Sequence, residues 1–171
     1  PEDNTLVYFG DAIKALGDGK IGGYLVRFTT ENDPDLSDQF FTKNTDLGIE
    51  TGSTLPVYYQ HGYDPHFKKS KVGRGTVTID DAGAWMEAQL QMRDEYEKNL
   101  YKLVEAGKVG WSSGAAGHLV EFEPVGKAEH IKTWVIAEAS LTNTPCEWRN
   151  SVMPIKSLFS SEAVVTDNET Q

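Results

Sequence analysis

Three side chains able to act as nucleophile, base and carboxylate partner of the base lie far apart in the sequence, at Ser112, His61 and Glu138. His61 follows the apolar run 56–60 and precedes Gly62. An imidazole at the end of a strand, with a glycine leaving space beside it, suits a general base that a substrate must reach. Taken alone, this segment is more typical of a histidine in a surface turn.

The candidate nucleophile lies in the run Gly110-Trp111-Ser112-Ser113-Gly114. Consecutive residues of a strand face opposite sides, so the two serines cannot both point into one site. Ser113 shares its face with the bulky Trp111, whereas Ser112 shares its face with two glycines that let a substrate backbone approach. The pattern favours Ser112 as the nucleophile. A plain turn is the more common interpretation of such a run alone.

Glu138 closes the apolar run 134–137. A carboxylate at the end of a buried strand needs a partner, because burying an unpaired charge is costly. An imidazole would serve, and a carboxylate that accepts from its second nitrogen would orient His61. An ion pair with Lys132 or Arg149 is the alternative, and on this segment alone it is the better one.

A metal site is a competing hypothesis, because His61, Asp64 and His66 are possible ligands within six residues. Pro65 interrupts the run, and no helix places both histidines on one face. We therefore expect no metal ion and no cofactor, and keep a metallohydrolase only as an alternative.

The elements that must position these residues are mostly strands, because the hydrophobic period is mostly two. The hairpin turn at 80–83 contains a glycine that can take a positive φ. Apolar residues at helical spacing predict one helix over 93–106, ended by Gly107. Strands are expected at 21–28, 55–60, 71–79, 84–91, 108–112, 118–123 and 131–141. The predicted fold is mainly β with flanking helices (α+β), arranged as a small closed barrel of about seven strands.

Composition bounds the class of protein. With 171 residues, 39% of them hydrophobic, the chain suits a single domain. We expect the domain over 1–159 and a disordered polar tail over 160–171. A formal net charge of -10 argues against a nucleic-acid partner, and no apolar run is long enough to cross a membrane. The lone Cys146 excludes a disulfide framework, and the missing initial Met predicts a trimmed product.

Four stretches, taken together, resemble the prohead (procapsid) maturation serine proteases of tailed phages, whose fold is similar to the herpesvirus assemblins. They span about residues 20–150 and keep the order His, Ser, Glu. The stretches are Thr45–Gly48 leading to Pro56–Gly62, Val72–Gly75 with Asp81–Gly83, Leu103–Gly107 followed by Val109–Gly114, and Ile136–Pro145.

The resemblance implies an endopeptidase in which His61 is the base, Ser112 the nucleophile and Glu138 the third member. Because the assemblins use a second histidine as third member, His118 or His130 is the alternative to Glu138.

For the oxyanion, backbone N–H groups near Ser113 and Gly114 are the expected donors, with Arg74 as a weaker candidate. The resemblance also implies an enzyme that works inside the viral procapsid in the host cytoplasm. Its expected substrates are the N-terminal segment of the major capsid protein, the scaffold protein and the protease itself. A homo-oligomer is expected, and a non-enzymatic virion or capsid-assembly protein of related barrel fold is the alternative.

Overall fold

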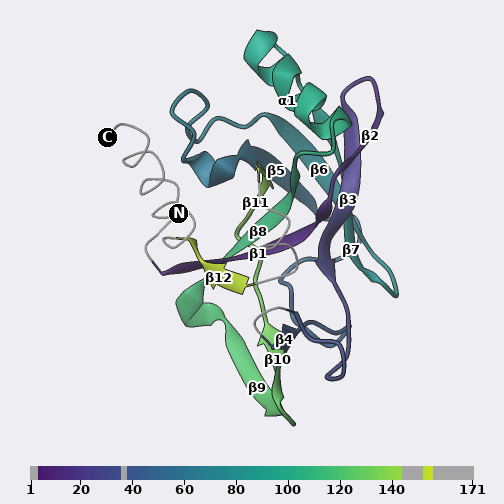
Figure 1. Cartoon of the computed structure of the whole chain (residues 1–171), viewed down its shortest axis with the longest axis vertical. Coiled ribbons are helices and arrows are strands. Elements are labelled where there is room, and N and C mark those ends of the chain that lie inside the picture. Colours follow the sequence, from purple (N-terminus) through teal and green to yellow (C-terminus); the bar gives the residue numbers. More distant parts are fainter. Residues whose placement is uncertain (1–3, 36–37, 144–151, 156–171) are drawn as a thin grey trace.

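The computed structural model describes residues 4–35, 38–143 and 152–155, which form one large curled sheet and one small sheet (Figure 1). The large sheet has nine strands in the order β12 (Val152–Pro154), β1 (Thr5–Ala12), β8 (Gly110–Ala116), β11 (Glu138–Thr142), β5 (Thr54–Tyr59), β6 (Gly73–Ile79), β7 (Gly83–Leu90), β3 (Lys20–Arg27) and β2 (Lys14–Gly17). The small sheet has the order β4 (Gln39–Phe40), β10 (Ala128–Thr133) and β9 (Glu121–Val125).

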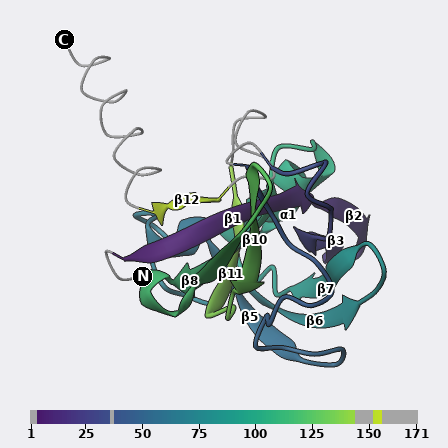
Figure 2. The ribbon, with the colours of Figure 1, turned by 90° about the horizontal axis from the view of Figure 1, so that it is seen from below.

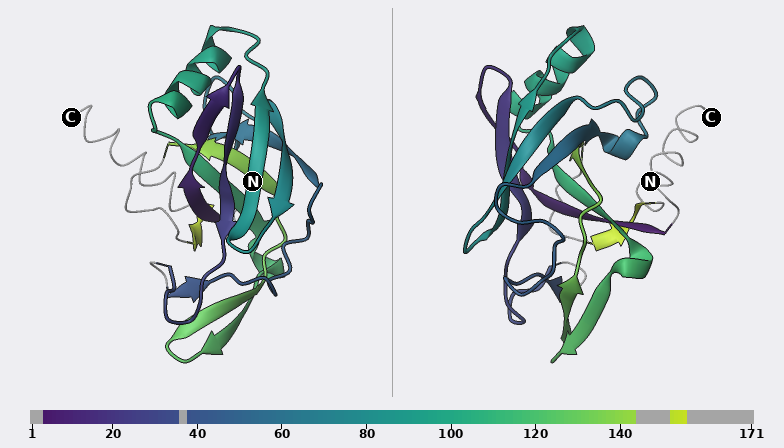
Figure 3. Two further views of the ribbon diagram at one scale, coloured as in Figure 1. Left: turned by 90° about the vertical axis from the view of Figure 1, so that its right-hand side faces the viewer. Right: turned by 180° about the vertical axis from the view of Figure 1, so that it is seen from behind.

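The prediction of a closed barrel of about seven strands is wrong, whereas the mainly β, α+β class is right. The large sheet curls into a half-barrel whose end strands, β12 and β2, are not paired with each other (Figures 2 and 3). The curl brings β1 against β3 so tightly that a Cβ added at Gly10 would lie 2.4 Å from the carbonyl oxygen of Tyr24. Among the described residues no backbone hydrogen-bond ladder joins β1 and β3. The two strands pack against each other without closing the sheet into a barrel.

The predicted hairpin at 80–83 is confirmed as the turn between β6 and β7. Gly83 has φ 156°, and a Cβ there would meet the carbonyl oxygen of Val26 at 2.0 Å. Asp80 Oδ1 accepts from the backbone N–H of Ala82 and Gly83 at 2.8 and 3.0 Å. The hydroxyl of Tyr24 donates to the other oxygen of Asp80 at 2.7 Å, and this hydrogen bond lowers the pKa of the carboxyl. The turn therefore carries its own hydrogen-bond acceptor.

The expected strand over 131–141 is two strands that belong to different sheets, β10 and β11. Between them the backbone N–H of Trp134 donates to the carbonyl of Asp46, and that of Ala137 to the carbonyl of Gly114, both at 2.8 Å. These bonds to other segments turn the chain out of the small sheet and start β11 beside β8.

Strand β1 is absent from the sequence-based expectations because both of its faces are apolar, which hides the period of two. Tyr8 faces the main core, whereas Val7 and Phe9 pack with Ile155 in a second cluster on the opposite face. The hairpin strand β2, which pairs with β3, is also missing from the expectations.

Other boundaries differ by a few residues. Strand β8 extends beyond the expected 108–112, and the start of the expected 118–123 strand is the 3₁₀ helix η2 (Gly117–Leu119). The expected tail at 160–171 lies outside the described residues.

The helix α1 (Glu95–Glu105) matches the expected one, within two residues at either end. Asp94 caps it, accepting from the backbone N–H of Glu97 at 2.9 Å, and Gly107 follows it with φ 70°. Leu100 and Val104 face the core. No helix among the described residues is long and apolar enough to cross a membrane.

Candidate active site

The three predicted site residues meet on the face of the large sheet that is turned away from the main core. Strands β8, β11 and β5 are neighbours, and their register places Ser112 opposite Ser140, and Ser140 opposite Tyr58. The 3₁₀ helix η1 (Gln60–Gly62) follows directly after β5 and carries His61 to this face. Two adjacent strands and the turn after a third therefore bring together residues distant in sequence.

A continuous chain of hydrogen bonds joins the three side chains. His61 Nε2 lies 2.7 Å from Ser112 Oγ, and His61 Nδ1 lies 2.5 Å from Glu138 Oε1. When the Glu138 carboxylate is ionised it can only accept, which favours the tautomer with the hydrogen on Nδ1 and leaves the lone pair of Nε2 to accept from the serine hydroxyl. This is the protonation pattern that a general base requires.

Burial shields His61 and Ser112 from water and leaves only part of Glu138 exposed. The side chain of His61 has no exposed surface, Ser112 has none either, and the side chain of Glu138 is 18% exposed. Charge interactions are stronger in such surroundings than in bulk water, which strengthens the hold of the carboxylate on the imidazole.

The backbone around His61 is strained, and Ser140 supports it. Gln60 and His61 have φ of 51° and 53°, the left-handed region that disfavours residues with a side chain. The backbone N–H of His61 donates to Ser140 Oγ at 3.0 Å. Ser140 is a site residue without a predicted role, although alternation in a strand places it on the same face as Glu138.

Ser112 and Ser113 face opposite sides of the sheet, as strand alternation predicts. Ser113 Oγ accepts from the indole Nε1 of Trp134 at 3.1 Å within the core. Gly114, next along the strand, makes room for the acid: a Cβ there would lie 2.9 Å from both Cγ and Oε1 of Glu138. The glycine expected to admit a substrate backbone thus accommodates the carboxylate.

Arg74 lies two strands from β11, on the face that carries Glu138, because it pairs with Pro56 and the next residue, Val57, pairs with Ala139. One of its guanidinium nitrogens, Nη2, donates to Thr54 Oγ1 at 2.7 Å. The structure therefore does not bring Arg74 into contact with the hydrogen-bonded chain.

The alternative metal ligands go to separate partners. Asp64 Oδ2 accepts from the backbone N–H of His66 and Phe67, both at 2.9 Å, and the ring of His66 stacks on Tyr96 at 3.8 Å. His61 is engaged as described above. The described residues contain no group of three side chains arranged to hold a metal ion.

The two remaining histidines are also engaged elsewhere. His118 Nδ1 lies 3.0 Å from Asn4 Nδ2 at an exposed position. His130 lies between Glu123 and Thr42, at 2.7 and 2.8 Å. The partner of the His61 ring on the side away from Ser112 is therefore a carboxylate and neither of these imidazoles.

Comparison with known protein families finds a match over residues 11–146 to caudovirus prohead serine protease. The matched range contains the whole hydrogen-bonded chain. Comparison with curated proteins and with solved structures finds no match. The chain belongs to the caudovirus prohead serine protease family.

Proposed function

We propose that this chain is a serine endopeptidase that cleaves the capsid protein, the scaffold protein and itself during maturation of a phage procapsid. The family name supports a serine protease of the prohead. The observation that carries the proposal is the chain of hydrogen bonds from Ser112 through His61 to Glu138, with distances of 2.7 and 2.5 Å.

In the proposed reaction, Ser112 Oγ attacks the carbonyl carbon of the scissile peptide while its proton passes to His61 Nε2. The tetrahedral intermediate collapses when the C–N bond breaks and His61 gives this proton to the leaving amine. Water then attacks the acyl-enzyme by the same route and releases Ser112. Glu138 holds the ring in the required tautomer and stabilises its charged form.

Burial of the nucleophile sets a condition on this reaction. Ser112 has no exposed surface, so neighbouring groups cover its Oγ. A peptide substrate has to displace neighbouring chain before its carbonyl can come within reach of Oγ. We expect binding of the substrate segment and opening of the site to be coupled.

For the oxyanion, we propose the backbone N–H groups of Ser113 and Gly114 as donors and Arg74 as a second contact. Strand β8 lies between β1 and β11, and its N–H groups point alternately toward these two neighbours. A donor from β8 therefore becomes available only where the ladder opens, which agrees with a site that must open for its substrate. Arg74 would have to exchange its bond to Thr54 for a substrate oxygen.

The direct test is co-expression of the chain with the capsid and scaffold proteins of the same phage. We expect the capsid protein to lose an N-terminal segment, detected by intact mass, and a fluorophosphonate added to the assembling particles to label Ser112. Fully intact capsid and scaffold proteins, with no labelled serine, would support the non-enzymatic alternative.

Replacing Ser140 with alanine tests how the base is held. The buried N–H of His61 then loses its acceptor, which costs about 1–3 kcal/mol in free energy of unfolding. Because the imidazole is also less well placed, we expect kcat to fall with KM little changed. The measurements are urea denaturation and the rate of capsid-protein cleavage.

Ser53→Ala is the matched control for this change. Ser53 Oγ accepts from the backbone N–H of Glu50 at an exposed position, where water can replace it. We expect the control to leave both stability and cleavage nearly unchanged. Lower stability of Ser140→Ala with an unchanged kcat would give Ser140 a purely structural role.

A further inference from the structure

A cavity of about 360 Å³ lies beside the small sheet, and neither Ser112, His61 nor Glu138 lines it. Cavities of about this volume are large enough to hold a small ligand. Strands β4, β9 and β10 lie at one end of the molecule and α1 at the opposite end (Figures 1 and 3). The lining residues are Thr29, Thr30, Glu31, Phe40, Thr42, Asn44, Glu123, Val125 and His130.

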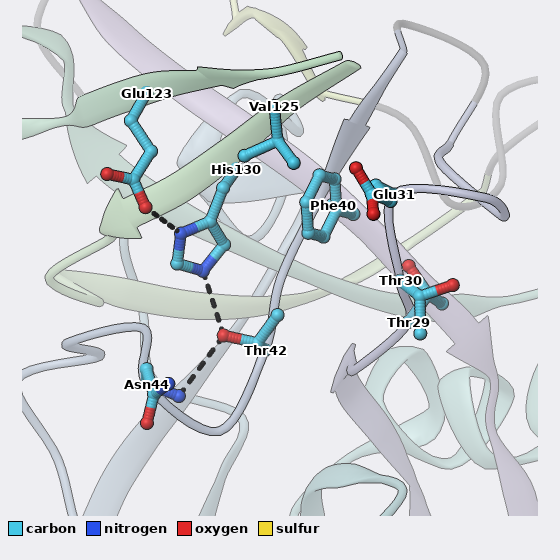
Figure 4. Close-up of a pocket in the computed structure, with 9 residues that line it drawn as sticks. All are labelled: Thr29, Thr30, Glu31, Phe40, Thr42, Asn44, Glu123, Val125 and His130. Atoms are coloured by element: carbon cyan, nitrogen blue, oxygen red, sulfur yellow. Dashed lines mark hydrogen bonds and ion pairs between the residues drawn. The ribbon is translucent and has the colours of Figure 1, made fainter. Parts of the chain in front are cut away.

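The register of the small sheet explains why several of these side chains converge. His130 pairs with Phe40 on one side and with Glu123 on the other, and Val125 lies two residues along β9. Residues paired in this way share a face of the sheet. Figure 4 shows Glu123 and Glu31 on opposite sides of the pocket, with Phe40 and Val125 between them.

The cavity is lined by two carboxylates, and the only basic group among its described lining residues is the imidazole of His130, which lies against Glu123. None of the described lining residues is Lys or Arg. Within the described chain, Glu31 takes part in no hydrogen bond or ion pair, and Glu123 gives one oxygen to His130 while its side chain stays 47% exposed. The free carboxylate oxygens therefore make this pocket a site for a positive charge.

His130 forms part of the wall of the pocket but offers a ligand no free hydrogen-bond donor or acceptor. Its Nδ1 lies 2.7 Å from Glu123 Oε1, and its Nε2 lies 2.8 Å from Thr42 Oγ1, which also accepts from the backbone N–H of Asn44 at 3.2 Å. The His130 ring lies 5.3 Å from the ring of Phe40. With both imidazole nitrogens engaged, only the carboxylates and the hydroxyls near Glu31 remain for a ligand.

We propose that this pocket binds the basic side chain, Lys or Arg, of a polypeptide partner. The charged head would lie between Glu31 and Glu123, and its methylene stem would pack on Phe40 and Val125. A bare divalent cation fits less well, because both nitrogens of His130 are engaged and the described residues contain no three-ligand group. The pocket would thus hold a polypeptide at a point remote from the bond that is cleaved.

The test is an NMR titration of the full chain with N-acetyl-L-lysine methylamide, N-acetyl-L-arginine methylamide and the neutral N-acetyl-L-norleucine methylamide. We expect saturable shifts of the Val125 methyl and His130 ring signals with the two cationic probes, with a Kd on the order of millimolar. Equal shifts with the norleucine probe would overturn the proposal. The same shifts with magnesium chloride alone would replace it by a metal site.

Charge variants locate the binding. Glu31→Gln and Glu123→Gln should each weaken binding about fivefold or more. The amide introduced by Glu123→Gln retains an oxygen that can accept from His130. Glu129→Gln is the matched control, because it changes the net charge equally and lies on β10 opposite Pro124, on the other face of the sheet. Equal weakening by the control would show that binding follows net charge and not the pocket.

We expect binding of the lysine probe to be independent of peptide hydrolysis at Ser112. The Ser112→Ala chain should bind the lysine probe as tightly as the unaltered chain, because Ser112 does not line the pocket. Binding without hydrolysis would overturn only the proposed function, and hydrolysis without binding would overturn only the proposed pocket.

Discussion

Replacing Ser112 with alanine is expected to lower the rate of capsid-protein cleavage by about 10⁴-fold or more. Alanine removes the oxygen that forms the bond to the substrate carbonyl. This is the hydroxyl that His61 Nε2 contacts at 2.7 Å. The fold should remain, because the change removes a single atom from a small side chain. The measurements are the rate of appearance of the shortened capsid protein and the thermal unfolding of the variant.

The neighbouring serine is a sharp control for this result. Ser113 has the same side chain on the same strand but accepts from Trp134 in the core, at 3.1 Å. Ser113→Ala should keep cleavage within a few-fold and lower the free energy of unfolding by about 1–3 kcal/mol, since the indole N–H loses its acceptor. Full activity of Ser112→Ala, or loss of activity only in Ser113→Ala, would contradict the assigned nucleophile.

Replacing Glu138 with glutamine is expected to lower kcat by about 10³–10⁴-fold with little change in fold. The amide group is nearly the same shape as the carboxylate but can donate a hydrogen bond to His61 Nδ1. That donation moves the ring hydrogen to Nε2, where the lone pair must accept the proton of Ser112. The measurement is kcat for cleavage of a capsid-derived peptide, with thermal unfolding as a check on the fold.

Two further variants separate a role of the carboxylate from a general effect of substitution. His118→Gln should leave cleavage unchanged, because His118 contacts Asn4 at an exposed position. Gly114→Ala should lower kcat without touching Glu138 chemically, because its Cβ would lie 2.9 Å from Oε1, the atom that His61 contacts. Unchanged kcat in Glu138→Gln together with inactivity of His118→Gln would assign the third position to the histidine.

The partners of each histidine cannot be predicted from the sequence alone. Among the residues that the structure describes, two imidazoles each lie between a hydroxyl and a carboxylate: His61 and His130. The hydroxyl partner of His130 is a threonine that lines an open pocket, whereas the hydroxyl partner of His61 is a serine without exposed surface. Residue types and spacing do not distinguish the two arrangements, because the partners of each imidazole come from other segments: Ser112, Glu138 and Glu123 from strands, and Thr42 from the connection after β4.

What the sequence determined by itself concerns neighbouring residues. The Asp80 turn, the cap and end of α1, and the opposite orientation of Ser112 and Ser113 follow from rules of φ, capping and alternation that act within a few residues. The sequence also predicts that Glu138, at the end of the apolar run 134–137, needs a partner for its carboxylate, whereas in the structure Glu138 begins β11. The membership of the family also rests on motifs that are visible in the sequence.

What only the tertiary structure decided depends on which distant segments pair. The half-barrel in place of a closed barrel, and the division of 131–141 between two sheets, are set by hydrogen bonds to residues far along the chain. The left-handed turn at His61 persists because Ser140, a residue of another strand, accepts its backbone N–H. Local rules fix which way a side chain points, but its partner is decided only by the register between strands.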